Sequence, residues 1–283
     1  MRYSVRRPLL SAAAVLLAGA MAFAQPVLRA GADFQIFQYQ TPVTRTHPIG
    51  GTVTRIEIEE TSADVNIVYD IRSAPRVVCD EFPTRPHTVT VTDGVLKVSA
   101  YDPGVSISLF SATKGDPEVT IYLPDTTYES LTFASSSGDL ETSSKLTFGS
   151  VSAESVSGDL EISSTVTGSL QAETTSGDVE IKSPQAGSLR AVTVSGDIEV
   201  DRVTASGPME LNTTSGEVDV SDSEAAALTL SAASGKVELE RVTITGDASV
   251  TTTSGRIEMT QFRVQGTPTI ETRTGRIRGW PMK

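Results

Sequence analysis

The chain has 283 residues and a formal net charge of −12, with 35 acidic against 23 basic side chains. A surface this acidic repels nucleic acid and anionic membranes, so nucleic-acid binding is excluded as a function. The single cysteine, Cys79, cannot form an internal disulfide, and the fold must be held together by its core and its backbone hydrogen bonds. We expect Cys79 to be a buried apolar residue, with an intermolecular disulfide as the alternative.

Residues 1–24 have the pattern of an export signal. Arg2, Arg6 and Arg7 precede an apolar run that ends in Ala22-Phe23-Ala24, a small-x-small cleavage site. The alternative is an N-terminal membrane anchor, but the run is short for a membrane span. We therefore expect cleavage before Gln25, export to the periplasm, the cell surface or the medium, and no membrane span in the mature chain. Without the leader, 20 basic and 35 acidic residues remain, a net charge of −15.

Residues 25–50 and 51–125 lack a regular period. The first segment is polar and contains prolines, so it is interpreted as a linker. In the second, apolar residues alternate around Ser62-Ala63-Asp64 with the offsets of the later repeats, and Ala63 occupies the position that glycine has there. A hairpin is predicted around Asp93-Gly94, and a strand at 119–123 ends at Pro124. We interpret 51–125 as an irregular first part of a solenoid that caps its N-terminal end.

Residues 126–283 contain one short motif eight times, Ser or Thr followed by Gly, a charged residue and an aliphatic one. Successive glycines are 19 or 20 residues apart, and a fixed period of this length indicates a repeat architecture. The glycines are Gly138, Gly158, Gly177, Gly196, Gly216, Gly235, Gly255 and Gly275.

Apolar residues alternate with polar ones on both sides of each glycine, which predicts two strands that meet at a glycine corner. A strand pair of this size cannot bury its apolar side chains alone, but stacked coils can, with equivalent strands parallel and about 4.8 Å apart. The prediction is an all-β, right-handed parallel β-solenoid of 19–20 residues per coil. Glycine is expected at the corner because it tolerates positive φ, and the preceding Ser or Thr is expected to bond to the turn backbone. Threonines three residues before the glycine should line the inside of the corner.

The C-terminal end is predicted to be capped. Arg273, Arg276 and Arg278 crowd the last strand, where charges discourage pairing with another chain. Trp280 is expected to cover the open end of the core, and Pro281 to end the ladder.

The chain resembles a bacterial family of exported β-solenoids known as "putative adhesin" domains of unknown function. The leader, the Ser62-Ala63-Asp64-Val65 copy, the strand at 119–124 and coils such as the segment 157–162 carry this resemblance, which covers about residues 50–279. It implies a right-handed β-solenoid that attaches to a surface or partner. No catalytic or ligand residues come with it. The chain departs from the pattern where Lys236, Arg256 and Arg276 replace the acid after glycine.

Two outward columns of carboxylates follow the corners. The first is Asp139, Asp159, Asp178, Asp197 and Glu217; the second is Glu141, Glu161, Glu180, Glu199 and Asp219. At 4.8 Å, stacked carboxylates repel by roughly 0.9 kcal/mol per pair even in water. We interpret the two columns as an acidic stripe whose charge is not compensated. It is either a solvated face that keeps the rod soluble or a binding stripe for a cationic partner. The columns diverge, so they predict at most weak binding of divalent cations and no metal or cofactor site.

Enzymatic function is disfavoured by the pattern. The two histidines, His47 and His87, lie outside the regular array, so no histidine triad or zinc cluster can be built on it. We therefore predict a non-enzymatic exported adhesin or binding module of the bacterial cell envelope with an unidentified envelope or surface partner. The alternatives are a structural envelope scaffold without a ligand and a polysaccharide-active β-helix enzyme, which a deep acidic pocket in residues 70–125 would favour.

Overall fold

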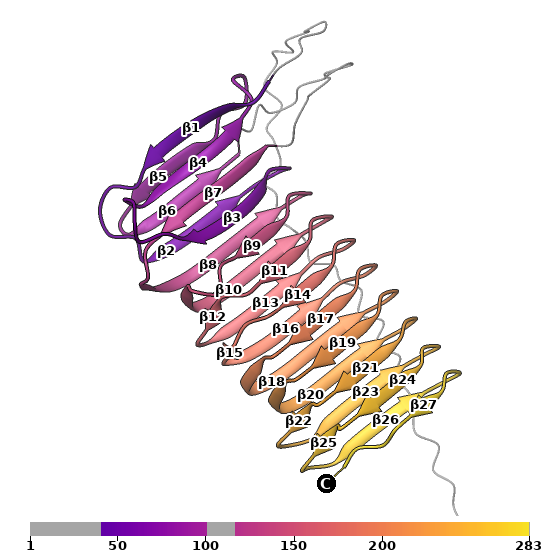
Figure 1. Cartoon of the computed structure of the whole chain (residues 1–283). Helices are drawn as coiled ribbons and strands as arrows, with labels where there is room; N and C mark the ends of the chain where they lie inside the picture. Colours follow the sequence, from indigo (N-terminus) through magenta and orange to yellow (C-terminus); the bar gives the residue numbers. More distant parts are fainter. Residues whose placement is uncertain (1–40, 101–116, 283) are drawn as a thin grey trace, which may run out of the picture.

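A computed structural model describes residues 41–100 and 117–282. The expected signal peptide, its cleavage site and the first part of the expected linker, residues 25–40, lie outside the described residues. The described chain contains strands and no helix, hence no helical segment that could cross a membrane. Its strands form two long sheets, one of 12 and one of 15 strands, which face each other along a rod (Figure 1).

The 12-stranded sheet contains one short strand from each regular coil. In spatial order its strands are β1 (Val43–Pro48), β4 (Arg76–Glu81), β7 (Glu118–Leu123), β3 (Asp64–Tyr69), β9 (Leu140–Thr142), β11 (Leu160–Ile162), β14 (Val179–Ile181), β17 (Ile198–Asp201), β19 (Val218–Ser221), β21 (Val237–Glu240), β24 (Ile257–Thr260) and β27 (Ile277–Arg278).

The 15-stranded sheet contains a second, longer strand from each coil. In several coils it also contains a short third strand. The long side, in spatial order, is β5 (Thr88–Thr92), β6 (Val95–Ser99), β2 (Arg55–Glu59), β8 (Thr127–Ser135), β10 (Thr147–Ser155), β13 (Ser169–Glu173), β16 (Ser188–Val192), β18 (Thr204–Thr213), β20 (Glu224–Ala232), β23 (Ala248–Thr252) and β26 (Pro268–Thr272). The short strands of the third side are β12 (Thr165–Val166), β15 (Gln185–Ala186), β22 (Thr243–Ile244) and β25 (Arg263–Val264).

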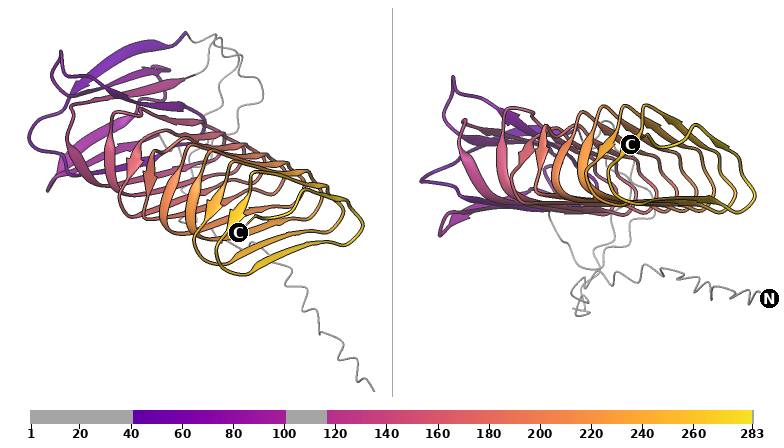
Figure 2. Two further views of the ribbon diagram at one scale, coloured as in Figure 1. Left: turned by 60° about the horizontal axis from the view of Figure 1, so that its bottom comes forward. Right: turned by 90° about the horizontal axis from the view of Figure 1, so that it is seen from below.

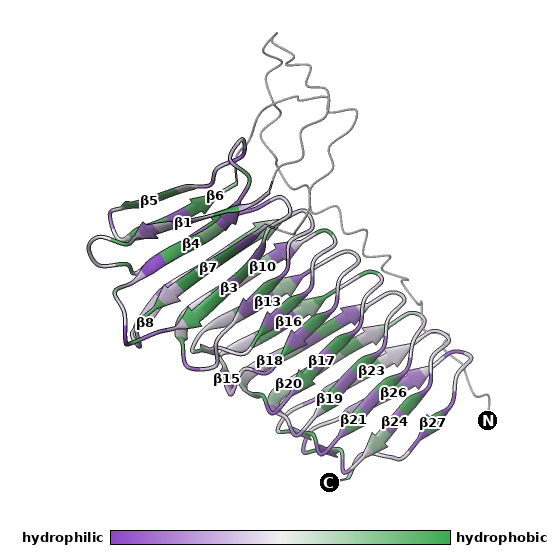
Figure 3. Ribbon diagram, turned by 45° about the horizontal axis from the view of Figure 1, so that its top comes forward, coloured by the Kyte–Doolittle hydropathy of each residue, from purple (hydrophilic) through white to green (hydrophobic). Residues whose placement is uncertain are grey.

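The coils stack in parallel with the register that the sequence period predicts. Val179 pairs with Leu160 of the preceding coil and with Ile198 of the next one, and Ile181 pairs in the same way. The alternating inward side chains, Ile181 among them, are fully buried between the two sheets. Successive coils follow one another along the rod as loops of similar shape (Figure 2), and apolar and polar residues alternate along the strands (Figure 3). The predicted parallel β-solenoid is confirmed.

Glycine at the corners has a different physical reason from the expected one. Among the described glycines, positive φ occurs at Gly51, Gly94 and Gly279, none of which is a repeat corner. A Cβ on Gly177 would instead lie 2.0 Å from the carbonyl oxygen of Gly158 in the preceding coil. Because this clash recurs at every corner glycine, the residue is required by the close approach of neighbouring coils.

The hydroxyl three residues before the glycine completes the corner, as predicted for the threonines. Oγ1 of Thr174 accepts a hydrogen bond from the backbone N–H of Gly177 and donates one to the carbonyl oxygen of Gly158. These buried hydroxyls satisfy backbone groups in their own coil and in the preceding one. It is this hydroxyl, and not that of the residue directly before the glycine, that bonds to the glycine N–H.

The N-terminal cap interleaves segments that are distant in sequence. Strands β6 and β7 run parallel to β2 and β3 and form a coil that precedes theirs in space, although it follows theirs in the chain. Beyond them lie β4 and β5, both antiparallel to their neighbours, and β1 at the outer edge. The expectation of a linker is therefore wrong for Val43–Pro48, which pairs with β4. The predicted hairpin is present, with positive φ at Asp93 and Gly94.

The expectation of a tryptophan cap at the C-terminal end is wrong. Trp280 is 67% exposed, and the core end is left to the partly buried Ile270 and Ile277. Pro281 does not end the pairing either. The backbone turns at Gly279, which has positive φ, so that Met282 exchanges backbone hydrogen bonds with Phe262 and Val264.

Candidate functional site

The two predicted carboxylate columns lie on the outer face of the 12-stranded sheet, where the alternation of β9, β11, β14, β17 and β19 turns them away from the core. Asp64 and Asn66 of β3 extend the columns into the cap, since Asn66 pairs with Glu141 and Oδ1 of Asp64 accepts a hydrogen bond from the N–H of Asp139. We call the outward carboxylates of this part of the sheet the acidic face. Its members are Asp64, Asp139, Asp159, Asp178, Asp197, Glu217, Glu141, Glu161, Glu180, Glu199 and Asp219.

The aspartate column has a structural role that the sequence pattern did not indicate. Oδ1 of Asp139 accepts a hydrogen bond of 2.8 Å from the backbone N–H of Asp159, which lies in the next coil. The same bond recurs from coil to coil, beginning at Asp64 and ending where Asp197 accepts from the N–H of Glu217. One oxygen of each aspartate is therefore used in a structural hydrogen bond. It satisfies a backbone N–H at the corner that has no backbone carbonyl partner in the sheet.

The glutamate column is partly neutralised at one place. Nζ of Lys182, which projects from the end of β14, contacts the carboxylates of Glu180 and Glu161. Among the described residues, no basic side chain lies within ion-pair distance of Glu141, Glu199 or Asp219. The prediction that no basic side chain compensates the charge of the stripe is therefore wrong for Glu161 and Glu180, which Lys182 contacts.

Two carboxyl groups of the glutamate column have raised pKa values. Partial burial, together with the neighbouring charge of Glu180, raises the pKa of Glu199. Partial burial and the charge of Glu238 likewise raise the pKa of Asp219. Both groups would be stabilised by a cation placed on this face.

The acidic face is hollowed next to the cap. An open depression of about 400 Å³ is lined by Asp64, Asn66, Asp139, Glu141, Asp159, Glu161, Asp178 and Glu180, together with Val65, Leu140 and Leu160. A second one, of about 590 Å³, adjoins it and is lined by Asn66, Glu118, Thr120, Tyr122, Glu141, Ser143, Ser144 and Ser163 among others. Both are open to solvent, so neither is the deep acidic pocket that would favour an enzyme.

The face changes character in the C-terminal coils. Nζ of Lys236 contacts Glu217 and Glu238, and the hydrogen bond with Glu238 raises the pKa of the lysine. Arg256 and Arg278 both lie 3.4 Å from Glu258. The outward carboxylates of β21 and β24 are therefore paired, and the unpaired ones of the glutamate column, Glu141, Glu199 and Asp219, lie on the strands from β9 to β19.

A second cluster of chemically active groups lies inside the cap. His87, just before β5, places Nδ1 2.8 Å from Oε2 of Glu81 and Nε2 3.2 Å from Oε1 of Glu60. Arg45 of β1 reaches the other oxygen of Glu81 at 2.9 Å. Burial lowers the pKa of His87, but the hydrogen bonds to Glu60 and Glu81 outweigh it and leave that pKa raised.

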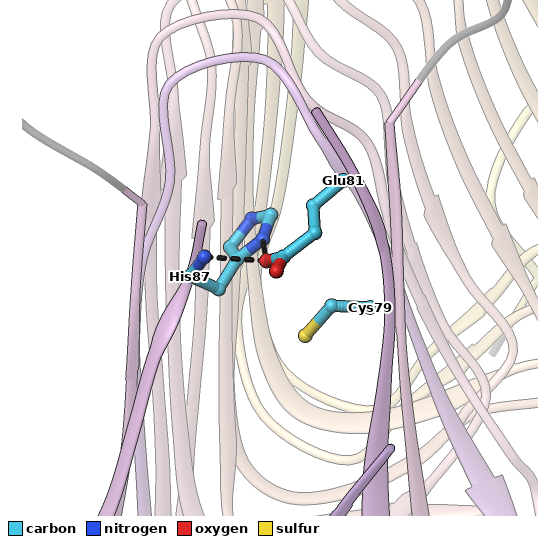
Figure 4. A group of neighbouring side chains, drawn as sticks. All are labelled: Cys79, Glu81 and His87. Carbon is cyan, nitrogen blue, oxygen red and sulfur yellow. Dashed lines mark hydrogen bonds and ion pairs between the residues drawn. The ribbon is translucent and has the colours of Figure 1, made fainter. Parts of the chain in front are cut away.

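Cys79 belongs to the same cluster and is fully buried, as predicted. Burial, reinforced by the charge of Glu81, raises the pKa of its thiol to about 12. Cys79 and Glu81 extend from the same strand, β4, toward His87 (Figure 4). Sequence reasoning missed this cluster because its members come from four separate segments of an irregular region. The one available signal was that Cys79 and Glu81, two apart on a strand, share a face.

The chain matches one family model twice, at residues 53–208 and 185–280. These matches cover nearly all of the part of the chain that the structure describes. The chain belongs to the Toastrack DUF4097 family. None of the curated proteins compared with it matches significantly.

Comparison with solved structures finds matches at low sequence identity. A protein from Parabacteroides distasonis named as a putative lipid binding protein is 19% identical, with a TM-score of 0.56, over 85% of this chain and 97% of that one. A putative adhesin from Bacteroides fragilis is 15% identical, with a TM-score of 0.49, over 84% and 96%. A putative cell adhesion protein from Clostridium sporogenes is 14% identical, with a TM-score of 0.37, over 70% and 99%. At these identities the likeness concerns the fold.

Proposed function

We propose that the protein is an exported, non-enzymatic adhesin or binding module of the bacterial cell envelope, and that its acidic face binds a cationic partner. The observation that carries the proposal is the set of carboxylates in the glutamate column of the 12-stranded sheet that no described basic side chain pairs, namely Glu141, which lines the depression, and Glu199 and Asp219 beyond it. Glu141 and its neighbours line an open depression of about 400 Å³, and the described structure places no basic side chain within ion-pair distance of Glu141 or Glu199.

The chemistry of this face suits recognition by charge. Open, repeated carboxylates offer many equivalent contacts to Lys or Arg side chains, and such contacts raise the association rate and give affinity that falls with salt. Both histidines of the chain lie in or beside the cap, at β1 and before β5, so the acidic face has no imidazole to act as a general base. A lipid with an anionic head group would be repelled by the same charge.

The test compares two variants with equal loss of charge. One is Glu141→Gln/Glu161→Gln/Glu199→Gln on the acidic face; its matched control is Glu154→Gln/Glu224→Gln/Glu271→Gln, whose side chains are exposed on the 15-stranded sheet. The probe is a Lys-rich peptide presented on a sensor surface at low and at physiological salt. The first variant should bind at least several-fold more weakly than the control, and the difference should shrink as salt is added.

Equal binding by the two variants would refute the acidic face as the binding surface. If neither variant nor the unmodified protein binds the peptide at low salt, the scaffold alternative replaces the proposal. If the unmodified protein binds the peptide and the first variant binds it more weakly, envelope proteins that the unmodified protein captures and the first variant does not would identify the natural partner.

A further inference from the structure

The buried cluster in the cap holds three side chains of the types that bind transition metals. The ligand atoms of Cys79, Glu81 and His87 all lie within 4.8 Å of one another, and all three residues are buried. In the described part of the chain, this is the one group of three or more such residues that could hold a metal ion. It is separate from the acidic face, whose carboxylates point outward from the rod.

The cluster also contains polar atoms that the protein itself leaves unsatisfied. Oε2 of Glu60 is buried and has no hydrogen-bond partner among the described residues. Oε1 of Glu81 accepts no hydrogen bond either, although Arg45 lies 2.9 Å away. A buried carboxylate in this condition is costly, and an absent ion is one of the explanations that such a group requires.

The arrangement around His87 has the form of a metal-binding histidine with its support. Nδ1 faces Glu81 on the side of Cys79, whereas Nε2 faces Glu60. A histidine that binds a metal through one ring nitrogen usually donates the other N–H to a carboxylate, which fixes the ring orientation. Glu60 is placed to accept that hydrogen bond.

We propose that Cys79, Glu81 and His87 form a binding site for a thiophilic divalent transition metal ion such as Zn²⁺, with Glu60 as the carboxylate that orients His87. A thiolate, an imidazole and a carboxylate are a ligand set for zinc and its neighbours, and they do not suit Ca²⁺ or Mg²⁺, which require oxygen ligands. Three protein ligands leave the fourth tetrahedral position for water or for an external ligand.

Metal binding requires unprotonated ligand atoms. Zinc binds cysteine as a thiolate and histidine through a ring nitrogen that carries no proton, so the thiol proton of Cys79 must leave when the ion binds. Zn²⁺ binding should therefore release at least one proton.

The experiment uses the full chain, reduced and stripped of metal with a chelator, and titrates it with Co²⁺ as a spectroscopic probe for zinc. We expect one equivalent of Co²⁺ to produce a thiolate-to-metal charge-transfer absorption that Zn²⁺ then abolishes by displacement. The Cys79→Ala variant should lose this absorption and bind Zn²⁺ at least about tenfold more weakly in calorimetry. Glu154→Gln, exposed on the opposite sheet, is the control and should behave as the unmodified protein.

The unmodified protein alone can overturn the proposal, whatever the stability of the variant. Absence of the charge-transfer absorption at stoichiometric Co²⁺ would refute the site. The same holds if Cys79→Ala, shown to be folded by circular dichroism, retains the absorption or the Zn²⁺ affinity. Co²⁺ binding without thiolate absorption would mean that only surface carboxylates hold the ion.

Discussion

At the scale of single residues, the aspartate column shows why a row of like charges is kept in a stacked protein. Each carboxylate repels its neighbours, yet each also accepts the backbone N–H of the next coil at 2.7–3.1 Å. A charged acceptor makes such a hydrogen bond stronger than a neutral one would. The short side chain of aspartate reaches that N–H, whereas the glutamates two residues later extend to solvent and to Lys182.

The structural role of the column can be separated from its charge at Asp178. The Asp178→Ala substitution leaves the N–H of Asp197 without its acceptor, and we expect it to lower the free energy of unfolding by about 1 kcal/mol. Asp178→Asn keeps an oxygen acceptor and removes one repelling charge, so it should stay within about 0.5 kcal/mol of the unmodified protein. Urea denaturation measures both; an equal loss in the two variants would show that the charge matters and the hydrogen bond does not.

Repulsion within the glutamate column should make stability depend on pH. The pKa of Glu199 is raised above 4.5 in the folded protein by burial and by Glu180, so the folded state binds this proton more tightly than the unfolded chain. Stability should therefore fall as pH rises from 4.5 through the raised pKa. At neutral pH, Glu199→Gln should stabilise the protein by less than about 1 kcal/mol because the side chain is solvent-screened, and the gain should vanish below pH 4.5.

Thermal unfolding over this pH range checks the prediction, with Glu224→Gln on the other sheet as control. If the stabilisation by Glu199→Gln grew as the pH fell, the predicted upward shift of the Glu199 pKa would be contradicted.

At the scale of elements, the glycine corners set how closely two coils can stack. The Gly177→Ala substitution would place Cβ 2.0 Å from a backbone carbonyl oxygen, so strands β11 and β14 would have to separate. We expect a loss of about 3 kcal/mol or more in unfolding free energy, beyond ordinary overpacking. Gly50→Ala, where no atom lies within 4 Å of the added Cβ, is the matched control and should change little. Equal effects in chemical denaturation would contradict close approach as the reason for glycine.

The regular elements could be predicted from the sequence. One period of 19–20 residues determines which side chains face inward, where the corners lie and how neighbouring strands are registered. The reason for the corner glycine could not, since the distance between coils is a tertiary quantity. The bond from each aspartate to the next coil escaped prediction for the same reason. Lys182 was overlooked because it belongs to a third outward column that holds serine in the two preceding coils.

Apart from its hairpin, the strand pairing of the cap could not be predicted from the sequence. Here β3 lies between β7 and β9, so spatial neighbours are separated by a long stretch of chain and no period indicates their pairing. The same interleaving brings Glu60, Glu81 and His87 together, although no local motif joins them. The exposure of Trp280 could not be predicted either, because the positive φ of Gly279 redirects the chain, which the residue types alone do not reveal.

Across the whole molecule, we expect the coils to be interchangeable units for both folding and binding. Deletion of residues 178–196 removes β14, β15 and β16 and joins Gly177 to Asp197, so every column keeps its register. Arg190 is lost with them, and its partners Glu173 and Glu210 become neighbours, which should cost a modest part of the stability. Deletion of residues 178–186 instead leaves part of a coil and sets strands against corners.

The most direct test is thermal unfolding of the two deletion variants, monitored by circular dichroism. Binding of the Lys-rich peptide is then measured at two salt concentrations for each variant that folds. The whole-coil deletion should melt cooperatively with a β spectrum and bind slightly more weakly, with a reduced salt dependence, because it loses Asp178 and Glu180 among many equivalent carboxylates. The half-coil deletion should not fold. An unfolded whole-coil deletion would contradict the modular stacking, and complete loss of binding by a folded one would contradict a distributed acidic face.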